Sequence, residues 1–128
     1  EPTKISTAFE VPADGPHGLD FDPATGRLLC ACDAGVLVAL DAGSGRVLGD
    51  VPLSGVPDVI FLHPQSRRLY VAVGEPGVID VIDIDTMRRQ EVVPTEAGAH
   101  TLALDRKRSK IYAFLPHTHR AAVFFDTA

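Results

Sequence analysis

The sequence predicts an all-β fold of the β-propeller class, and three observations lead to that prediction. A unit of about 42 residues occurs three times along the chain. Each unit contains short runs rich in Val and Ile, separated by turn-forming residues, and no segment has helical periodicity. Periods of this length with four short strands per unit are typical of propeller blades. We therefore expect three four-stranded blade-equivalents in the chain.

The middle unit, residues 57–86, contains three clear strand signals. The apolar runs are Val59–Leu62, Leu69–Val73 and Val78–Ile84. The stretches between them, His63–Ser66 and Gly74–Gly77, contain the turn-forming residues Pro, Ser and Gly. Connections this short join neighbouring antiparallel strands, so the unit is predicted to form a meander.

The other two units repeat this pattern on either side of the middle one. Residues 16–23 lie 41 positions before residues 57–64, and residues 99–106 lie 42 positions after them. The third strand of each unit is predicted to end in an aspartate that accepts hydrogen bonds in the next turn. These aspartates are Asp41, Asp83 and Asp126. The fourth strands, residues 45–52 and 88–94, both end in Val-Pro.

The chain is predicted to divide into one orphan strand and three blades. The segment Ile5–Pro12 also ends in Val-Pro, so it matches a fourth strand that has no preceding blade. The third unit stops at Ala128, after its third strand. We expect an orphan outer strand followed by three blades, the last of which lacks its outer strand. The predicted bounds are 1–12 for the orphan strand and 13–53, 54–95 and 96–128 for the blades.

The number of blades predicts an assembly. Closed propellers contain about four to eight blades, so three cannot close on themselves. An open half-ring would leave apolar surface and strand edges bare. We therefore expect a homodimer that forms a six-bladed ring, in which Ile5–Val11 of each copy completes the last blade by pairing with residues 121–126 of the other. The alternative is that the sequence is part of a longer, seven-bladed protein.

Several motifs in the repeats match those of a known group of propellers. They are Pro16-His17-Gly18-Leu19, Asp22-Pro23-Ala24-Thr25-Gly26-Arg27-Leu28-Leu29, Arg68-Leu69-Tyr70-Val71-Ala72 and Val81-Ile82-Asp83. With them the chain resembles the β-propellers with YVTN-type repeats, a group that is similar to the lactonase and quinoprotein amine dehydrogenase propellers. The resemblance covers nearly the whole chain and implies the propeller fold. It implies no single activity, because one propeller scaffold carries many unrelated functions.

Composition and charge argue against two classes of partner. The formal net charge of −5 does not suit a polyanion, and no apolar run approaches the roughly 20 residues of a membrane span. We therefore expect neither nucleic acid nor membrane as a partner. The basic stretch Arg106–Lys110 falls at a predicted turn and is interpreted as a solvated hairpin tip. The chain begins at Glu1 without Met, which fits either a cleaved signal peptide or a shortened chain. A periplasmic or secreted location is therefore one of the options.

The two cysteines, Cys30 and Cys32, are predicted to be buried thiols. They are two residues apart, so both point to the same face of a strand. The equivalent positions hold apolar residues, which marks them as core positions. These residues are Val71, Val73, Ala113 and Leu115. A redox or metal role for the thiols is the alternative.

The candidate binding site lies where the first strands of the units begin. In a propeller these strand starts converge on one face, where the loops between second and third strands also open. His17, Asp58 and His100 occupy equivalent strand starts, and His117 and His119 lie in the loop of the third unit. We predict that all five bind a ligand. We also predict that His17, Asp58 and His100 hold a transition metal, because imidazole and carboxylate suit such ions. The alternative is that the histidines only form turns and hairpin tips.

The remaining motifs do not indicate a reaction. His63 aligns with Asp22 and Asp105 before Pro64 and is predicted to form a turn. The sequence contains no nucleophile elbow, phosphate loop or dinucleotide fingerprint. The favoured function is a non-catalytic binding or scaffold propeller that takes a small molecule or a peptide. The alternative is a metal-dependent hydrolase of the lactonase kind, with His117 or His119 as general base.

Overall fold

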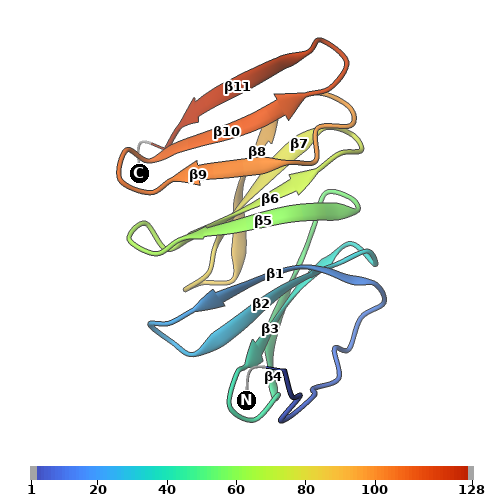
Figure 1. Cartoon of the computed structure of the whole chain (residues 1–128), viewed down its shortest axis with the longest axis vertical. Helices are drawn as coiled ribbons and strands as arrows, with labels where there is room; N and C mark the ends of the chain where they lie inside the picture. The colour runs from blue at the N-terminus through green and yellow to red at the C-terminus, as the bar shows by residue number, and fades with distance from the viewer. Residues whose placement is uncertain (1–2, 127–128) are drawn as a thin grey trace.

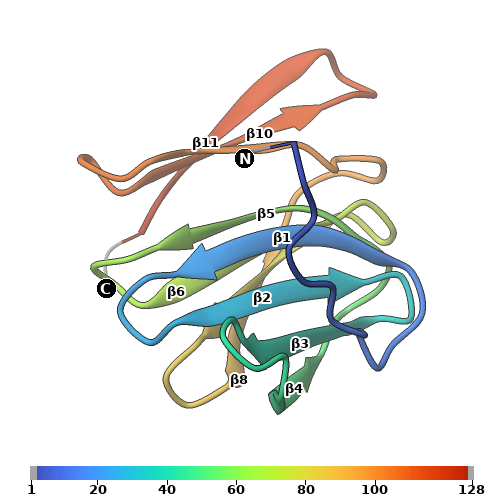
Figure 2. The ribbon, with the colours of Figure 1, turned by 60° about the horizontal axis from the view of Figure 1, so that its bottom comes forward.

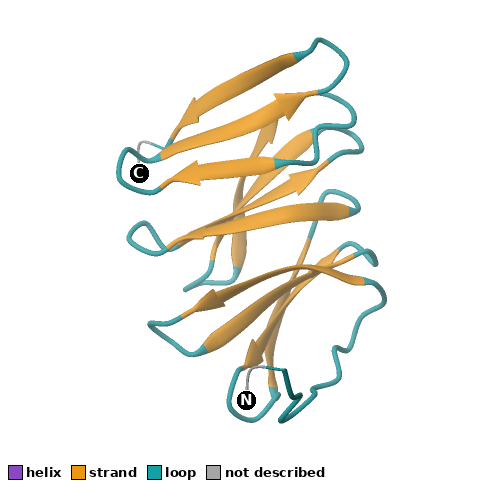
Figure 3. Ribbon diagram, in the orientation of Figure 1, coloured by secondary structure: helices purple, strands orange, loops and turns teal. Residues whose placement is uncertain are grey.

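The computed structural model describes residues 3–126, which form strands joined by turns (Figure 3). The first sheet contains β1 (Pro16–Asp22), β2 (Arg27–Cys32), β3 (Val36–Asp41) and β4 (Val47–Pro52). The second sheet contains β5 (Pro57–His63), β6 (Arg68–Val73), β7 (Val78–Asp83) and β8 (Arg88–Pro94). The third contains β9 (Leu102–Asp105), β10 (Lys110–Leu115) and β11 (Arg120–Phe125). Within this range there is no helix that could cross a membrane.

The three sheets follow one another like blades around an axis (Figure 1). Their strand orders are β1-β2-β3-β4, β5-β6-β7-β8 and β11-β10-β9, with every pair antiparallel. The first strands of the three sheets, β1, β5 and β9, lie beside one another. This arrangement confirms the predicted all-β fold, with blade-like sheets of four, four and three strands.

The strand register repeats from blade to blade, as the sequence repeat predicts. The pairing between third and fourth strands shifts by one residue at Ala39/Leu40 in the first blade and at Val81/Ile82 in the second. These two bulges lie at equivalent positions. The first and second strands also share an irregularity, after Pro16 in one blade and after Pro57 in the next. The first two blades are therefore irregular at equivalent places and present equivalent faces to their neighbours.

Alternate side chains of each blade pack against the preceding and the following blade. Between the first two blades, Leu69 and Val71 of β6 meet Leu29 and Ala31 of β2 in a fully buried cluster. Between the second and third blades, Ile111 and Ala113 occupy the same positions against Tyr70 and Ala72. The strand alternation expected from the sequence is therefore correct, and it divides the core into one apolar layer per blade interface.

Gly18 shows how closely the central strands approach. A Cβ atom at Gly18 would lie 2.5 Å from the carbonyl oxygen of Asp58. No side chain fits in that space, so β1 and β5 can approach only because this position is glycine.

Cys30 and Cys32 are buried free thiols, as predicted. They lie on the outer face of the first blade, and their sulfur atoms are 3.9 Å apart. Burial raises the pKa of both thiols, that of Cys32 to about 12. At neutral pH they are therefore protonated and pack as small apolar side chains.

The predicted pairing of the N-terminal segment requires a second copy. Within the single chain, residues 5–11 form no strand. The segment instead runs across the outer face of the β1–β4 sheet (Figure 2). There Val11 and Ala13 pack against the cluster that contains Cys30 and Cys32.

One predicted strand end is displaced by a residue. Asp41 and Asp83 end β3 and β7 and accept backbone N–H groups of the next turn, as expected. In β11 the equivalent place opposite the start of β10 belongs to Phe125, and Asp126 follows the strand. The side chain of Asp126 has partners in another blade. It turns toward the second blade and accepts hydrogen bonds from Arg68, at 2.6 Å, and from the Tyr70 hydroxyl.

Candidate functional site

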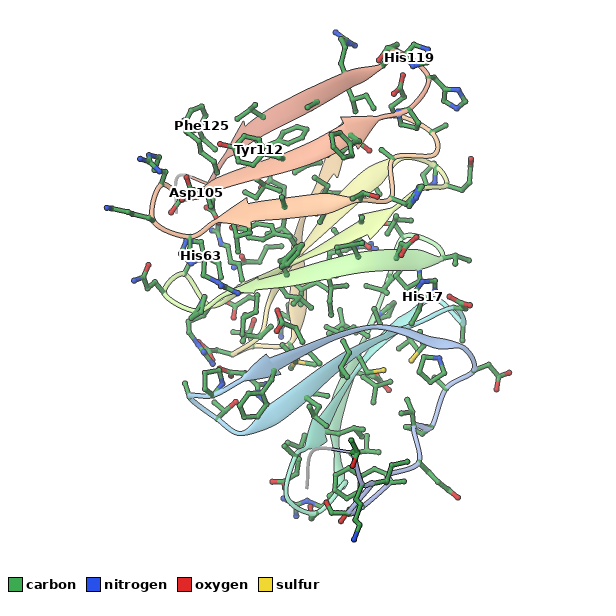
Figure 4. The ribbon with its side chains drawn as sticks, viewed as in Figure 1. His17, His63, Asp105, Tyr112, His119 and Phe125 are labelled. Carbon is green, nitrogen blue, oxygen red and sulfur yellow. The ribbon has the colours of Figure 1, made fainter. Side chains whose placement is uncertain are left out.

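The predicted binding residues lie along one edge of the blades. The starts of β1, β5 and β9 and the loops after β2, β6 and β10 share this edge (Figure 1). Figure 4 shows His17 and His119 on this side of the molecule, and His63 and Asp105 on the opposite side. We call this edge, with residues His17, Asp33, Asp58, His100 and His117–His119, the mouth.

His17 connects two blades at the mouth. Its Nδ1 atom lies 3.3 Å from Oδ1 of Asp33, in the loop after β2. Its Nε2 atom lies 3.2 Å from Oδ1 of Asp58, near the start of β5 in the second blade. All three side chains are about one third to one half exposed, so solvent reaches the contact. The structure therefore brings His17 into contact with Asp58 and with Asp33.

This geometry limits what His17 can do. Ionised carboxylates only accept hydrogen bonds, so an imidazole nitrogen that bonds to one must carry a proton. A nitrogen of His17 that donates to a carboxylate has no lone pair left for a metal. A metal ion bound by His17 would therefore have to replace one of the two aspartate contacts.

His100 and His117 both lie beside Gly98. Nδ1 of His100 donates to the carbonyl oxygen of Gly98 at 2.7 Å. On the other side, Nε2 of His117 lies 3.7 Å from the position that a Cβ atom of Gly98 would take. His100 also accepts a hydrogen bond at its backbone carbonyl from Val59 of the second blade. The third blade thus presents two imidazoles at the mouth, next to the Asp58 end of β5.

His119 occupies the turn between β10 and β11 and has a positive φ of 56°. Within residues 3–126, no three side chains of His, Cys, Asp or Glu lie close enough together to hold a metal ion. The metal set His17, Asp58 and His100 therefore stays a prediction.

Comparison with solved structures identifies the fold. Hydrazine synthase of Kuenenia stuttgartiensis superposes with a TM-score of 0.71 over 95% of this chain and 39% of its own, at 15% identity. Dihydro-heme d1 dehydrogenase NirN superposes with a TM-score of 0.75 over 88% of this chain and 26% of its own, at 17% identity. The WD40 repeats of RRP9 give a TM-score of 0.73 over 92% of this chain and 41% of theirs, at 12% identity.

The chain has the fold of a β-propeller. Identities this low establish the fold alone, and the three-bladed chain spans about a quarter to two fifths of the propeller proteins that it matches. No protein-family model matches the sequence, and no curated protein matches it.

A second polar cluster lies at the opposite edge of the propeller blades. Asp22 at the end of β1 is completely buried, and Arg67 of the second blade binds it with two parallel hydrogen bonds of 2.8 and 2.7 Å. Arg27 and Thr25 also bind Asp22, at 3.4 and 2.5 Å. Arg67 reaches Asp85 as well, at 3.0 Å. The hydrogen bonds from Arg67 hold the pKa of Asp22 far below the usual range, although burial by itself raises that pKa.

At the next blade interface, the equivalent position carries a single side-chain contact in place of the ion pair. One repeat later His63 takes the place of Asp22 and Ser109 that of Arg67, and their side chains meet at 3.0 Å. His63 is buried and starts the turn after β5, as predicted, but it also links the second blade to the third. In the third blade Asp105 binds Arg108 of its own turn, which lowers the pKa of Asp105.

Sequence reasoning did not find the ion pair between Asp22 and Arg67. Asp22 ends β1 and Arg67 lies in the turn before β6, and charged side chains at such places are ordinarily solvated. The available signal was the repeat alignment, which places Asp22, His63 and Asp105 at one repeat position and Gly26, Arg67 and Ser109 at another, four residues later in each unit. All three of the latter residues have positive φ, so the three turns share one backbone conformation at this position.

Proposed function

We propose that this chain is a non-catalytic binding or scaffold propeller, and that two copies close a six-bladed ring around the mouth. The uncovered blade faces carry this proposal. Leu19 and Phe21 on the outer face of the first blade are 64% and 47% exposed. Phe114 and Phe125 on the outer face of the third blade are both 65% exposed. At the inner interfaces the equivalent faces are covered by a neighbouring blade, so each flank favours a further blade as its partner.

Two copies would cover both exposed flanks with the same contact made twice. The outer face of the third blade in one copy would cover the first blade of the other, and the symmetric contact would do the same in return. In this ring Ile5–Val11 of each copy completes the third blade of the other. Six blades lie within the range of closed propellers.

The mouth is the proposed binding site. It combines His17 and Asp58, which already touch, with His100, His117 and His119 on the third blade. A two-fold axis would bring a second set of the same side chains around one opening. Carboxylates and imidazoles together suit a transition metal ion or the polar groups of a small molecule or peptide.

Light scattering tests the assembly. The purified chain should have a mass close to twice the 13.7 kDa of one copy. A variant that lacks residues 1–12 should be monomeric, because it loses the fourth strand of two blades at once. The control is a variant with Thr3→Ser alone, which should remain dimeric. A monodisperse, stable monomer of the full chain would contradict the two-chain ring and favour a piece of a longer propeller.

Metal titration tests the binding site separately from the assembly. A His17→Ala, His100→Ala double variant should remain dimeric and should lose most of the zinc binding that calorimetry detects in the parent protein. The matched control is His63→Asn, which removes an imidazole at the opposite edge. Full retention of zinc binding in the double variant would exclude the mouth as the metal site. Chelator-sensitive hydrolysis of a lactone by the parent protein would instead support the hydrolase of the lactonase kind.

A further inference from the structure

The outer edge of β11 differs from the equivalent edges of the other two blades. In the described part of the chain, β3 and β7 each pair with a fourth strand, but β11 pairs only with β10. A cavity of about 280 Å³ opens beside this edge, between the second and third blades. Its apolar lining includes Ile79, Val81, Val93, Ile111 and Phe124.

At the preceding interface the equivalent space contains Met87. One repeat before Ile79, Val81 and Val93 lie Leu37, Ala39 and Val51, which form part of the buried cluster between the first two blades. Met87 packs against that cluster, and its Cε atom lies 3.9 Å from the place of a Cβ at Gly49 in β4. The cavity is thus the position where a Met87 equivalent belongs.

The repeat assigns that equivalent to Ile5. Residues 5–12 align with residues 45–52 and 87–94 through their shared Val-Pro ends, so Ile5 corresponds to Met87. Ile5 is 87% exposed in the single chain, which is costly for an isoleucine that packs nowhere.

The other end of the same segment already packs against the first blade as the end of a fourth strand would. In the first blade Val51 and Leu53 pack into the cluster that contains Val71 and Val73 of the next blade. Val11 and Ala13 pack in the same way against Cys30 and Cys32, the equivalents of those two valines. Val11 and Ala13 therefore lie where the end of the fourth strand of a preceding blade would lie.

We propose that residues 5–12 of a second copy pair with β11 in one fixed register and insert Ile5 into this cavity. This inference rests on the two-copy ring proposed above and specifies its contact. In β7 and β8, Ile79 lies opposite Val93 and Val81 opposite Glu91. In β3 and β4, Leu37 lies opposite Val51 and Ala39 opposite Gly49.

The same register one repeat later predicts the contacts across the new strand pair. Val11 of one copy lies opposite Ala121 of the other, and Phe9 lies opposite Val123. Val11 then points toward its own first blade, which it already contacts. The backbone of β11 gains the hydrogen-bond partners that β3 and β7 have.

Disulfide trapping tests the register in the full-length protein. The background carries Cys30→Val and Cys32→Val, because the next blade has valine at both equivalent positions. In this background the pair Val11→Cys with Ala121→Cys should form a covalent dimer on oxidation. The control pair, Val11→Cys with Val123→Cys, lies two residues out of register and should form several-fold less. Within one chain residues 11 and 121 lie on opposite flanks, so a disulfide between them must join two copies (Figure 1).

Substitution of Ile5 tests the cavity. Ile5→Asp should raise the dissociation constant of the dimer about tenfold or more in sedimentation equilibrium, because an apolar anchor is lost at both contacts. Ser6→Asp, the adjacent control, should change it by less than about threefold. A dimer that neither forms the Val11–Ala121 disulfide nor responds to Ile5→Asp would overturn this inference and leave the two-copy ring standing. A monomer at all concentrations would overturn both.

Discussion

Replacing Leu69 with alanine should lower the free energy of unfolding by about 2–5 kcal/mol. Leu69 is completely buried in the cluster between the first two blades, where it packs with Leu29, Val71 and Ile82. The substitution removes buried methyl groups and leaves a cavity, since strands in two sheets cannot both move to fill it. Urea denaturation followed by circular dichroism measures the change.

Val56→Ala is the matched control for this measurement. Val56 is 56% exposed in the connection between the first and second blades, so its truncation should cost less than about 0.5 kcal/mol. An unchanged stability for Leu69→Ala would mean that β6 presents its other face to the first blade, because a slip of one residue reverses the buried face.

Removing the carboxylate of Asp22 should destabilise the protein by about 3–5 kcal/mol. The Asp22→Ala variant leaves the guanidinium of Arg67 without its bidentate partner at a blade interface, and Arg27 loses a contact as well. Asp85 continues to neutralise part of the charge on Arg67, so the lower end of the range is expected. The control is Asp105→Ala at the equivalent place in the third blade, where the partner Arg108 is exposed and the loss should be small.

The acid stability of the protein should follow from the same residue. The pKa of Asp22 is lower in the folded protein than in the unfolded chain, chiefly because of its hydrogen bonds with Arg67. As the pH falls below about 4, the unfolded chain takes up this proton first, so the stabilisation by Asp22 is present above that pH and is lost as the solution becomes more acidic. Asp22→Asn should flatten the fall in melting temperature between about pH 4 and pH 2. An identical acid profile in the variant would show that other carboxylates govern acid unfolding.

The local pattern of the sequence was sufficient for the blades and their strands. Alternation of apolar residues, turn-forming residues between the runs and the 41- or 42-residue repeat predict each strand within a few residues, because these signals act between neighbours in the chain. Burial of Cys30 and Cys32 followed from the same repeat, through their equivalence with Val71 and Val73. The shared Val-Pro ends also marked residues 5–12 as equivalent to a fourth strand, although the single chain leaves them unpaired.

Only the tertiary structure decided which polar side chains meet. Sequence reasoning placed His17 and Asp58 on one edge, but their contact and the added contact with Asp33 depend on how the second blade is rotated against the first. The burial of Asp22 under Arg67 and the turn of Asp126 toward Arg68 depend on the same rotation. Strand periodicity predicts on which face of its own sheet a residue lies. The packing between sheets determines what that face touches, and that packing depends on side chains far apart in the sequence.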